Sequence, residues 1–295
     1  MKEFGIYRVV KHLGDGAMGT VLLVESPERQ RYALKLMHAK AERSAEAVDR
    51  FSREVRIALT LKHQNIVETF HGGRAPTGML YLLTEYCPLG GLDRWLAAQG
   101  PIALRHALRW MGGVAEALEY AGLVHQVVHR DIKPANLLLD EVRQVKLADM
   151  GLAKRTSAGA TNLTTHGSII GALLYMSPEQ ADASHDLDAR SDLYALGATF
   201  YHLLSGQPPF MAKQPAQILY DIREKEPRPL LTLRPELPHA LGDLVQTLLA
   251  KKREDRPASA SAVLETLAAI AEEEGVAIEV SRVTLRPRTA PLPFP

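Results

Sequence analysis

The sequence contains Val128-His-Arg-Asp-Ile-Lys-Pro-Ala-Asn-Leu137, and Asp149-Met-Gly151 follows shortly after it. Together the two segments hold two aspartates, an asparagine, a histidine, an arginine and a lysine between apolar residues. A lone Asp or Asn in such a place most often caps a loop or a turn. The meaning of these segments therefore depends on which other motifs accompany them, and in which order.

A glycine-rich motif lies upstream, in Leu13-Gly-Asp-Gly-Ala-Met-Gly-Thr-Val21, where Gly14, Gly16 and Gly19 form G-x-G-x-x-G. Such glycines let backbone N–H groups approach phosphate oxygens. In a dinucleotide-binding fold the motif leads into a helix, and a P-loop continues with Gly-Lys-Ser/Thr. Here a predicted strand, Thr20–Val24, follows instead. The motif alone is compatible with an ordinary hairpin, but its context predicts a phosphate-binding flap between two strands.

Lys35 lies in the apolar run Tyr32-Ala-Leu-Lys-Leu36, where an unpaired ammonium is costly. A lone lysine of this kind is more often a strand-edge residue, but the position after the glycine flap favours a functional role. The next predicted helix carries Glu54 on an amphipathic pattern. We expect Glu54 to pair with Lys35 and to hold it against the α- and β-phosphates of a nucleotide.

Periodicity divides the chain into three parts. Residues 1–86 are strand-rich with one helix, residues 87–273 are mainly helical, and residues 274–295 form a proline-rich tail that we interpret as a linker in preference to a docking segment. The stretch Thr156–Ser168 is polar and without period, which predicts a mobile loop. The predicted strands are Tyr7–Leu13, Thr20–Val24, Arg31–Met37, Val67–His71 and Met79–Tyr86, and the predicted helices are Ala45–Leu61, Leu104–Val124, Arg190–Ser205, His239–Leu249 and Ser261–Glu273.

Composition narrows the function classes. The chain of 295 residues has 35 basic and 34 acidic side chains and a net charge of +1, so no bulk charge attracts nucleic acid or an anionic membrane. The single cysteine, Cys87, excludes an internal disulfide and a cysteine-rich zinc cluster. No apolar run reaches the roughly 18 to 20 residues of a spanning helix. We therefore expect a cytoplasmic protein without a membrane span or a nucleic-acid partner.

The order and spacing of these motifs resemble the eukaryotic-type (Hanks-type) serine/threonine protein kinases, and the resemblance covers roughly residues 7 to 272. It implies an α+β bilobal kinase fold, with a small antiparallel β-sheet lobe that has one helix and a larger, mainly helical lobe. Phrases such as Met176-Ser-Pro-Glu-Gln-Ala181 resemble bacterial members most. The implied partners are proteins with Ser or Thr hydroxyls, and a homodimer that phosphorylates itself in trans.

The resemblance also implies roles for single residues. Asp131 is the expected catalytic base or orienting carboxylate for the substrate hydroxyl, and Lys133, typical of serine/threonine-specific members, neutralises the transferring phosphoryl group. Asn136 and Asp149 are the expected ligands of Mg²⁺, with Mn²⁺ as the alternative ion. Lys35 and Glu54 complete the catalytic set. The expected ATP-binding residues are Leu13, Gly14, Gly16, Gly19, Val21, Ala33, Lys35, Thr84, Glu85, Cys87 and Asn136.

Two of these ATP-binding residues have a specific expectation. Thr84 controls the depth of the adenine pocket, and Glu85 and Cys87 offer backbone hydrogen bonds to adenine in a cleft beside the hinge. Cys87 can also be read as a nucleophile, but no activating histidine or aspartate pattern accompanies it, which favours a small hydrophobe.

Other matches concern architecture and regulation. Ser177-Pro-Glu179 and Arg256 resemble a buried ion-pair motif, and Asp192 resembles the carboxylate that braces the catalytic loop. Arg130 resembles an arginine that grips a phosphate added between residues 149 and 179. The candidate acceptors of that phosphate are Thr161, Thr164, Thr165 and Ser168, with Thr164 or Thr165 preferred.

Two residues depart from the family pattern. Met150 replaces the usual phenylalanine, and its flexible thioether can fill the same apolar slot. Ala172 replaces a threonine whose hydroxyl contacts the residues equivalent to Asp131 and Lys133. The loss of that hydrogen bond predicts lower activity and keeps a nucleotide-binding pseudokinase as the alternative to an active kinase. A Rossmann-type oxidoreductase, the third hypothesis, rests only on the glycine motif.

Overall fold

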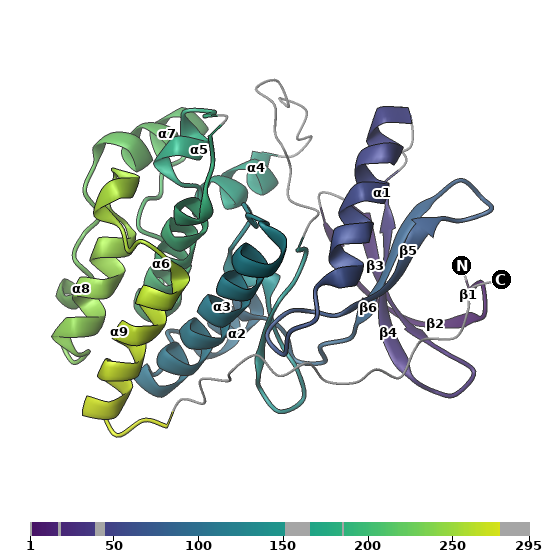
Figure 1. Cartoon of the computed structure of the whole chain (residues 1–295), viewed down its shortest axis with the longest axis horizontal. Helices are drawn as coiled ribbons and strands as arrows, with labels where there is room; N and C mark the ends of the chain where they lie inside the picture. The colour runs from purple at the N-terminus through teal and green to yellow at the C-terminus, as the bar shows by residue number, and fades with distance from the viewer. Residues whose placement is uncertain (1, 17–18, 39–44, 151–165, 185, 278–295) are drawn as a thin grey trace.

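The computed structural model of the protein describes residues 2–16, 19–38, 45–150, 166–184 and 186–277. These residues form two lobes, which Figure 1 shows side by side: a β-sheet with helix α1, and a larger group of helices. The predicted α+β bilobal fold is confirmed, and among the described residues the sheet lobe has one helix, as predicted.

The sheet lobe is a six-stranded antiparallel sheet in the order β1-β2-β3-β4-β6-β5. Helix α1 (Ala45–Thr60) packs against this sheet, where β5 contacts it. The strands are β1 (Glu3–Phe4), β2 (Tyr7–Gly16), β3 (Gly19–Glu25), β4 (Arg31–Met37), β5 (Thr69–Arg74) and β6 (Leu80–Glu85).

The two faces of this sheet have different partners, because side chains alternate along a strand. In β4, Leu34 and Leu36 belong to a buried cluster on one face. Met37 packs on the opposite face, with the apolar side of α1. Ala33 and Lys35 share the parity of Met37, so they lie on the α1 face.

The helical lobe is built around two long helices, α3 (Leu104–His125) and α6 (Ala189–Ser205), which contact each other. Leu108, Met111, Ala115 and Leu118 recur at three- and four-residue spacing on α3 and are buried in the largest core. The remaining elements are α2 (Leu92–Gln99), α4 (His166–Leu173), α5 (Pro178–Ala181), α7 (Pro215–Glu224), α8 (His239–Leu248), α9 (Ala260–Glu273), a small sheet of β7 (Gly90–Gly91), β8 (Leu137–Leu139) and β9 (Val145–Leu147), and 3₁₀ turns at Pro134–Asn136, Leu230–Thr232 and Arg253–Asp255.

The structure corrects one predicted strand. The sequence pattern predicts a strand over Val67–His71, but β5 runs over Thr69–Arg74. The Val67 amide donates to the Leu147 carbonyl of β9, at 3.0 Å, and Ile66 forms a bridge with the same residue. The chain before β5 therefore pairs with the helical lobe instead of the first sheet.

The predicted mobile loop over Thr156–Ser168 is wrong at its end. Residues 151–165 lie outside the described part of the chain, but α4 begins at His166, inside the predicted loop. Further along α4, Ile170 and Leu173 pack against the buried cluster of Phe210 and Ile218. Tertiary packing thus selects a helix where the local sequence has no period.

Candidate functional site

Asp131 lies in the loop of residues 126–136, which we call the Asp131 loop. The Lys133 ammonium contacts both carboxylate oxygens of Asp131, at 2.9 and 2.8 Å. Asn136 Nδ2 donates to the Asp131 carbonyl at 2.7 Å and to the carboxylate Oδ2 at 3.0 Å. The Asp131 side chain keeps 31% of its surface exposed. The carboxylate is therefore oriented by two donors and is still accessible to a substrate.

Asp192 braces the Asp131 loop from α6. Its two carboxylate oxygens accept the backbone N–H groups of His129, at 2.6 Å, and of Arg130, at 2.7 Å. Burial raises the pKa of Asp192, while the two amide donors oppose that shift. The bracing role predicted for Asp192 is confirmed by these bonds.

The fully buried His129 ring joins the Asp131 loop to the segment after β9. The Asp131 amide donates to His129 Nδ1 at 3.2 Å. The other ring nitrogen, Nε2, lies 2.9 Å from the Ala148 carbonyl, and because Nδ1 accepts the Asp131 amide, Nε2 is the nitrogen that can donate to this carbonyl. A direct bond from the Ala148 amide to the Asn136 carbonyl, at 2.9 Å, completes the connection.

Asp149 follows this connection and faces the sheet lobe. Lys35 Nζ on β4 lies 2.7 and 2.8 Å from its two carboxylate oxygens. Burial opposes ionisation of Asp149, but the Lys35 ammonium outweighs it and holds the pKa of the carboxyl below its usual value. Asp149 is thus an ionised carboxylate placed where the two lobes meet.

Glu54 is the remaining member of the predicted catalytic set. It lies three residues after Phe51 and four before Ala58, both buried, so it shares their face of α1. That face packs toward the side of the sheet that carries Lys35. The Lys35–Glu54 pair stays a prediction, whereas the Lys35–Asp149 pair is present.

The register of the sheet brings four of the predicted nucleotide-binding residues together on the α1 face. Val21 is directly opposite Lys35 across β3 and β4, and Ala33 is opposite Thr84 across β4 and β6. Directly paired residues project from the same face of a sheet. Residues distant in the sequence therefore form one surface, and Thr84 Oγ1 also contacts the Ala33 carbonyl, at 3.4 Å.

The three glycines of the flap have different surroundings. A Cβ on Gly19 would lie 2.0 Å from the Leu36 carbonyl oxygen, so close strand packing requires glycine there. The nearest atoms to a Cβ on Gly14 and Gly16 are at 3.6 and 3.8 Å. A Cβ at these two positions would make only ordinary contacts, so close packing does not explain their glycines. As predicted, the flap joins two strands, β2 and β3.

In the hinge after β6, the backbone N–H of Glu85 is already hydrogen-bonded. The Glu85 amide donates to the Glu68 carbonyl at 2.8 Å, so Glu85 can offer adenine its carbonyl but not its N–H. Cys87 is buried, and burial raises the pKa of its thiol to about 12. A protonated, buried thiol is a poor nucleophile, which supports the interpretation of Cys87 as a small hydrophobe.

Comparison with known families gives this arrangement an identity. The family described as "Protein kinase domain" matches residues 7–267. The chain belongs to the protein kinase family. Among its relatives, serine/threonine-protein kinase PknB of Mycolicibacterium smegmatis is 33% identical over 98% of this chain and 46% of the relative. PknJ of Mycobacterium tuberculosis is 37% identical over 84% of this chain and 42% of the relative.

A solved structure shows the same kinase fold. The crystal structure of the Mycobacterium tuberculosis PknI kinase domain is 30% identical, covers 92% of this chain and 97% of that domain, and superposes with a TM-score of 0.69. This kinase chain spans less than half the length of the curated relatives named above. These similarities place it with the bacterial Hanks-type serine/threonine kinases and exclude the Rossmann-type hypothesis.

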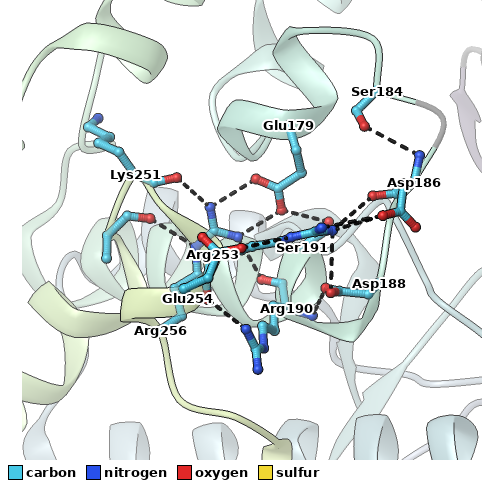
Figure 2. A network of polar contacts seen from close by, with 11 residues as sticks. Glu179, Ser184, Asp186, Asp188, Arg190, Ser191, Lys251, Arg253, Glu254 and Arg256 are labelled. Carbon is cyan, nitrogen blue, oxygen red and sulfur yellow. Dashed lines mark hydrogen bonds and ion pairs between the residues drawn. The ribbon is translucent and has the colours of Figure 1, made fainter.

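The ion pair that the kinase resemblance predicts is present in the helical lobe (Figure 2). Arg256 contacts both carboxylate oxygens of Glu179, at 2.7 and 2.9 Å, and its side chain is fully buried. Ser191 Oγ donates to the same carboxylate at 2.7 Å. Burial opposes ionisation of Glu179, but these donors lower its pKa overall. The pair fastens α5 to α6 and to the turn before α9.

Sequence reasoning missed three residues of this kinase site. Arg94 on α2 donates to the Leu13 carbonyl of the flap at 3.1 Å. Lys146 on β9 pairs with Glu85 at 2.9 Å. Gln180 on α5 donates to the Arg130 carbonyl at 3.0 Å. Each contact joins segments far apart in the chain, so no local spacing reveals it.

The regulatory predictions fall largely outside the described part of the chain. Thr161, Thr164 and Thr165 lie outside it, and Ser168 lies in α4, where its side chain is not described. Ala172 is also in α4. Met150 is buried in the core of the helical lobe, which confirms that its thioether fills an apolar slot.

The donor set suits a hard divalent cation. Asn136 uses both N–H bonds of its amide on Asp131, which leaves Oδ1 as the atom that can bind a cation beside Asp149. Within the described residues no group of three or more His, Cys, Asp and Glu side chains is placed to hold a metal. Phosphate oxygens and water would complete the shell. No helix in the described ranges is long and apolar enough to cross a membrane.

Proposed function

We propose that this kinase domain transfers the γ-phosphoryl group of ATP to serine or threonine hydroxyls of proteins. The observation that carries the proposal is the Asp131 carboxylate, held by Lys133 at 2.8 Å and Asn136 at 3.0 Å and connected through His129 to the Asp149 segment. The residues proposed to act on the substrate hydroxyl, the transferred phosphoryl group and the cation therefore belong to one connected region.

Asp131 accepts a hydrogen bond from the substrate hydroxyl and receives its proton as the oxygen attacks phosphorus. Lys133 lies against that carboxylate and contributes positive charge beside the transferred group. Because Lys133 and Asn136 both donate to Asp131, the carboxylate has a defined direction before substrate arrives. This preorganisation lowers the cost of aligning the reactants.

The nucleotide would lie on the α1 face of the sheet lobe, below the flap. Ala33 and Thr84 form the surface for the base, with the Glu85 carbonyl and the Cys87 amide as its hydrogen-bond partners. Lys35 would contact the phosphates, supported by Glu54. Asn136 and Asp149 would hold Mg²⁺, with Mn²⁺ as the alternative, and the ion supplies charge neutralisation on the phosphates when bound.

Regulation by phosphate is part of the proposal. Arg130 Nε is buried and has no hydrogen-bond partner among the described residues. A guanidinium with an unused donor is suited to a phosphate added at Thr164 or Thr165. The proposal has three further parts. The protein forms homodimers that autophosphorylate in trans, and it is located in the cytoplasm. The chain is divided into lobes 1–86 and 87–273, with a tail 274–295. The division is supported by β6 ending at Glu85.

The test is phosphate incorporation by the purified protein with Mg-ATP and a generic basic protein, followed by intact mass and peptide mapping. An Asp131→Asn variant keeps the size of the side chain but cannot accept the hydroxyl proton. Phosphate on Ser or Thr in the parent and not in the variant supports the proposal. Mg-ATP binding without incorporation in either protein would instead support the pseudokinase.

A further inference from the structure

The backbone of Arg130, the residue before Asp131, has an unusual conformation. Its φ is +67°, in the left-handed region that residues with a Cβ rarely adopt. Such a conformation persists only where the surroundings enforce it. Since Arg130 directly precedes Asp131, the groups that enforce its conformation also determine where the Asp131 side chain points.

Two side chains hold Arg130, one at each end of its backbone. The Arg130 amide donates to Asp192 Oδ1 at 2.7 Å. The Arg130 carbonyl accepts from Gln180 Nε2 at 3.0 Å. Asp192 comes from α6 and Gln180 from α5, so two separate elements converge on this single residue.

The Gln180 side chain is itself fixed at its other end. Its Oε1 accepts the Ser177 amide at 3.0 Å, while Ser177 Oγ accepts the Gln180 amide at 3.4 Å. This reciprocal pair is a capping box at the start of α5. The side-chain amide of Gln180 therefore has two separable functions. Its Oε1 caps α5, and its Nε2 holds the Arg130 carbonyl.

The neighbours of these two residues fasten α5 to α6. Glu179, beside Gln180, accepts from Ser191, beside Asp192, at 2.7 Å. Arg256 binds the same Glu179 carboxylate, as Figure 2 shows. In each pair of adjacent residues, one joins the two helices and the other holds Arg130. Gln180 is thus presented from a buried, ion-paired support.

We propose that Gln180 is a positioning residue for phosphoryl transfer, which acts by fixing the Arg130 carbonyl and, through it, the direction of Asp131. The inference rests on the proposed kinase activity. It adds that α5 and the Asp131 loop act as one unit, joined by the side-chain amide of Gln180.

Gln180→Glu separates the two functions of that amide. A glutamate of nearly the same shape still accepts the Ser177 amide, but when ionised it cannot donate to the Arg130 carbonyl. We expect kcat to fall about tenfold, with the KM for ATP changed less than about twofold, because a buried acceptor loses its donor and no ATP-binding residue is touched. The control variant is Gln217→Glu, which makes the same substitution on α7, where Gln217 Nε2 bonds Asp221. The melting temperature of Gln180→Glu should change no more than that of this control.

The pH dependence of kcat distinguishes this positioning role from a purely structural role, which would not make the kcat ratio depend on pH. A protonated glutamate regains an O–H donor, so the ratio of variant to parent kcat should rise as the pH is lowered from about 8 to about 5.5. A variant kcat within about twofold of the parent at all pH values would overturn the proposal. The proposal would also be overturned if kcat fell and the melting temperature of Gln180→Glu fell clearly below that of Gln217→Glu, because the loss of activity would then reflect lost stability.

Amide hydrogen exchange tests the contact between Gln180 and the Arg130 carbonyl independently of catalysis. In Gln180→Glu we expect faster exchange in peptides that cover residues 128–134 than in the parent or in Gln217→Glu. If the parent proves inactive, the proposed kinase function fails. The exchange measurement alone then shows whether Gln180 fixes the backbone of the Asp131 loop. Unchanged exchange would overturn the role of Gln180.

Discussion

Lys35 Nζ and Asp149 Oδ1 lie 2.7 Å apart, although 114 residues separate them in the chain. The pair joins β4 of the sheet lobe to the segment after β9 of the helical lobe. Lys35 keeps 14% of its side-chain surface exposed and Asp149 keeps 29%, so water screens the pair only in part. Each group satisfies the charge of the other where a nucleotide and its cation are expected to bind.

This pair predicts a pH-dependent loss of stability in Lys35→Met. We expect the free energy of unfolding at pH 7 to fall by about 1–3 kcal/mol, because the Asp149 carboxylate loses its counter-charge. The folded-state pKa of Asp149 is below its unfolded value, so the pair stabilises the fold above the unfolded pKa and loses this effect as the pH falls through the folded pKa.

The difference between the parent and Lys35→Met should therefore be largest at pH 7, shrink as the pH falls below about 4, and be clearly smaller at about pH 3. Urea unfolding at both pH values measures it, with the exposed Lys213→Met as the control. An equal difference at the two pH values would contradict the assignment to Asp149.

The Glu179–Arg256 pair predicts strong coupling in a double-mutant cycle. Arg256→Met alone should lower the free energy of unfolding by about 3–5 kcal/mol, because it leaves the Glu179 carboxylate, which is only 13% exposed, without its charged partner. Glu179→Gln should rescue part of this loss in the double variant. Urea unfolding of the four proteins gives the coupling energy, and additive losses would show that the two side chains are energetically independent.

The contact between Arg94 and the flap predicts an effect on nucleotide binding. Arg94 is exposed but donates to the Leu13 carbonyl at 3.1 Å, so it restrains the flap from α2. In Arg94→Ala we expect the KM for ATP to rise about two- to fivefold with little change in kcat. The exposed Arg105→Ala on α3 is the control. A fall in kcat at constant KM would instead assign Arg94 to the chemical step.

Ala172 predicts a gain of activity on substitution. Ala172→Thr should raise kcat about two- to tenfold if the added hydroxyl bonds the Asp131–Lys133 pair, as the family resemblance implies. Ala172→Val is the matched control, because valine has the shape of threonine without the hydroxyl. Steady-state kinetics on one protein substrate compares the three proteins, and equal activity of the Thr and Val variants would rule out the hydroxyl.

The sequence alone determined the family and the two-lobe architecture, and it predicted the residues of the site. These features depend on local spacing: Asp131, Lys133 and Asn136 lie within six residues of each other, and alternation along β4 places Lys35 on one face of the sheet. Asp192 and Arg256 were also predicted, from motifs that are each contiguous in the chain. The hydrogen bonds in the structure confirm their bracing roles.

Tertiary structure decided what depends on contacts between distant segments. Lys35 is paired with Asp149, and Gln180 and Arg94 reach the Asp131 loop and the flap from helices elsewhere in the chain. The start of β5 and the helix α4 also depend on such contacts, with β9 and with the cluster around Phe210. Hydrogen bonds and packing between segments distant in the sequence depend on where both partners lie in the folded chain. No local sequence period encodes those positions.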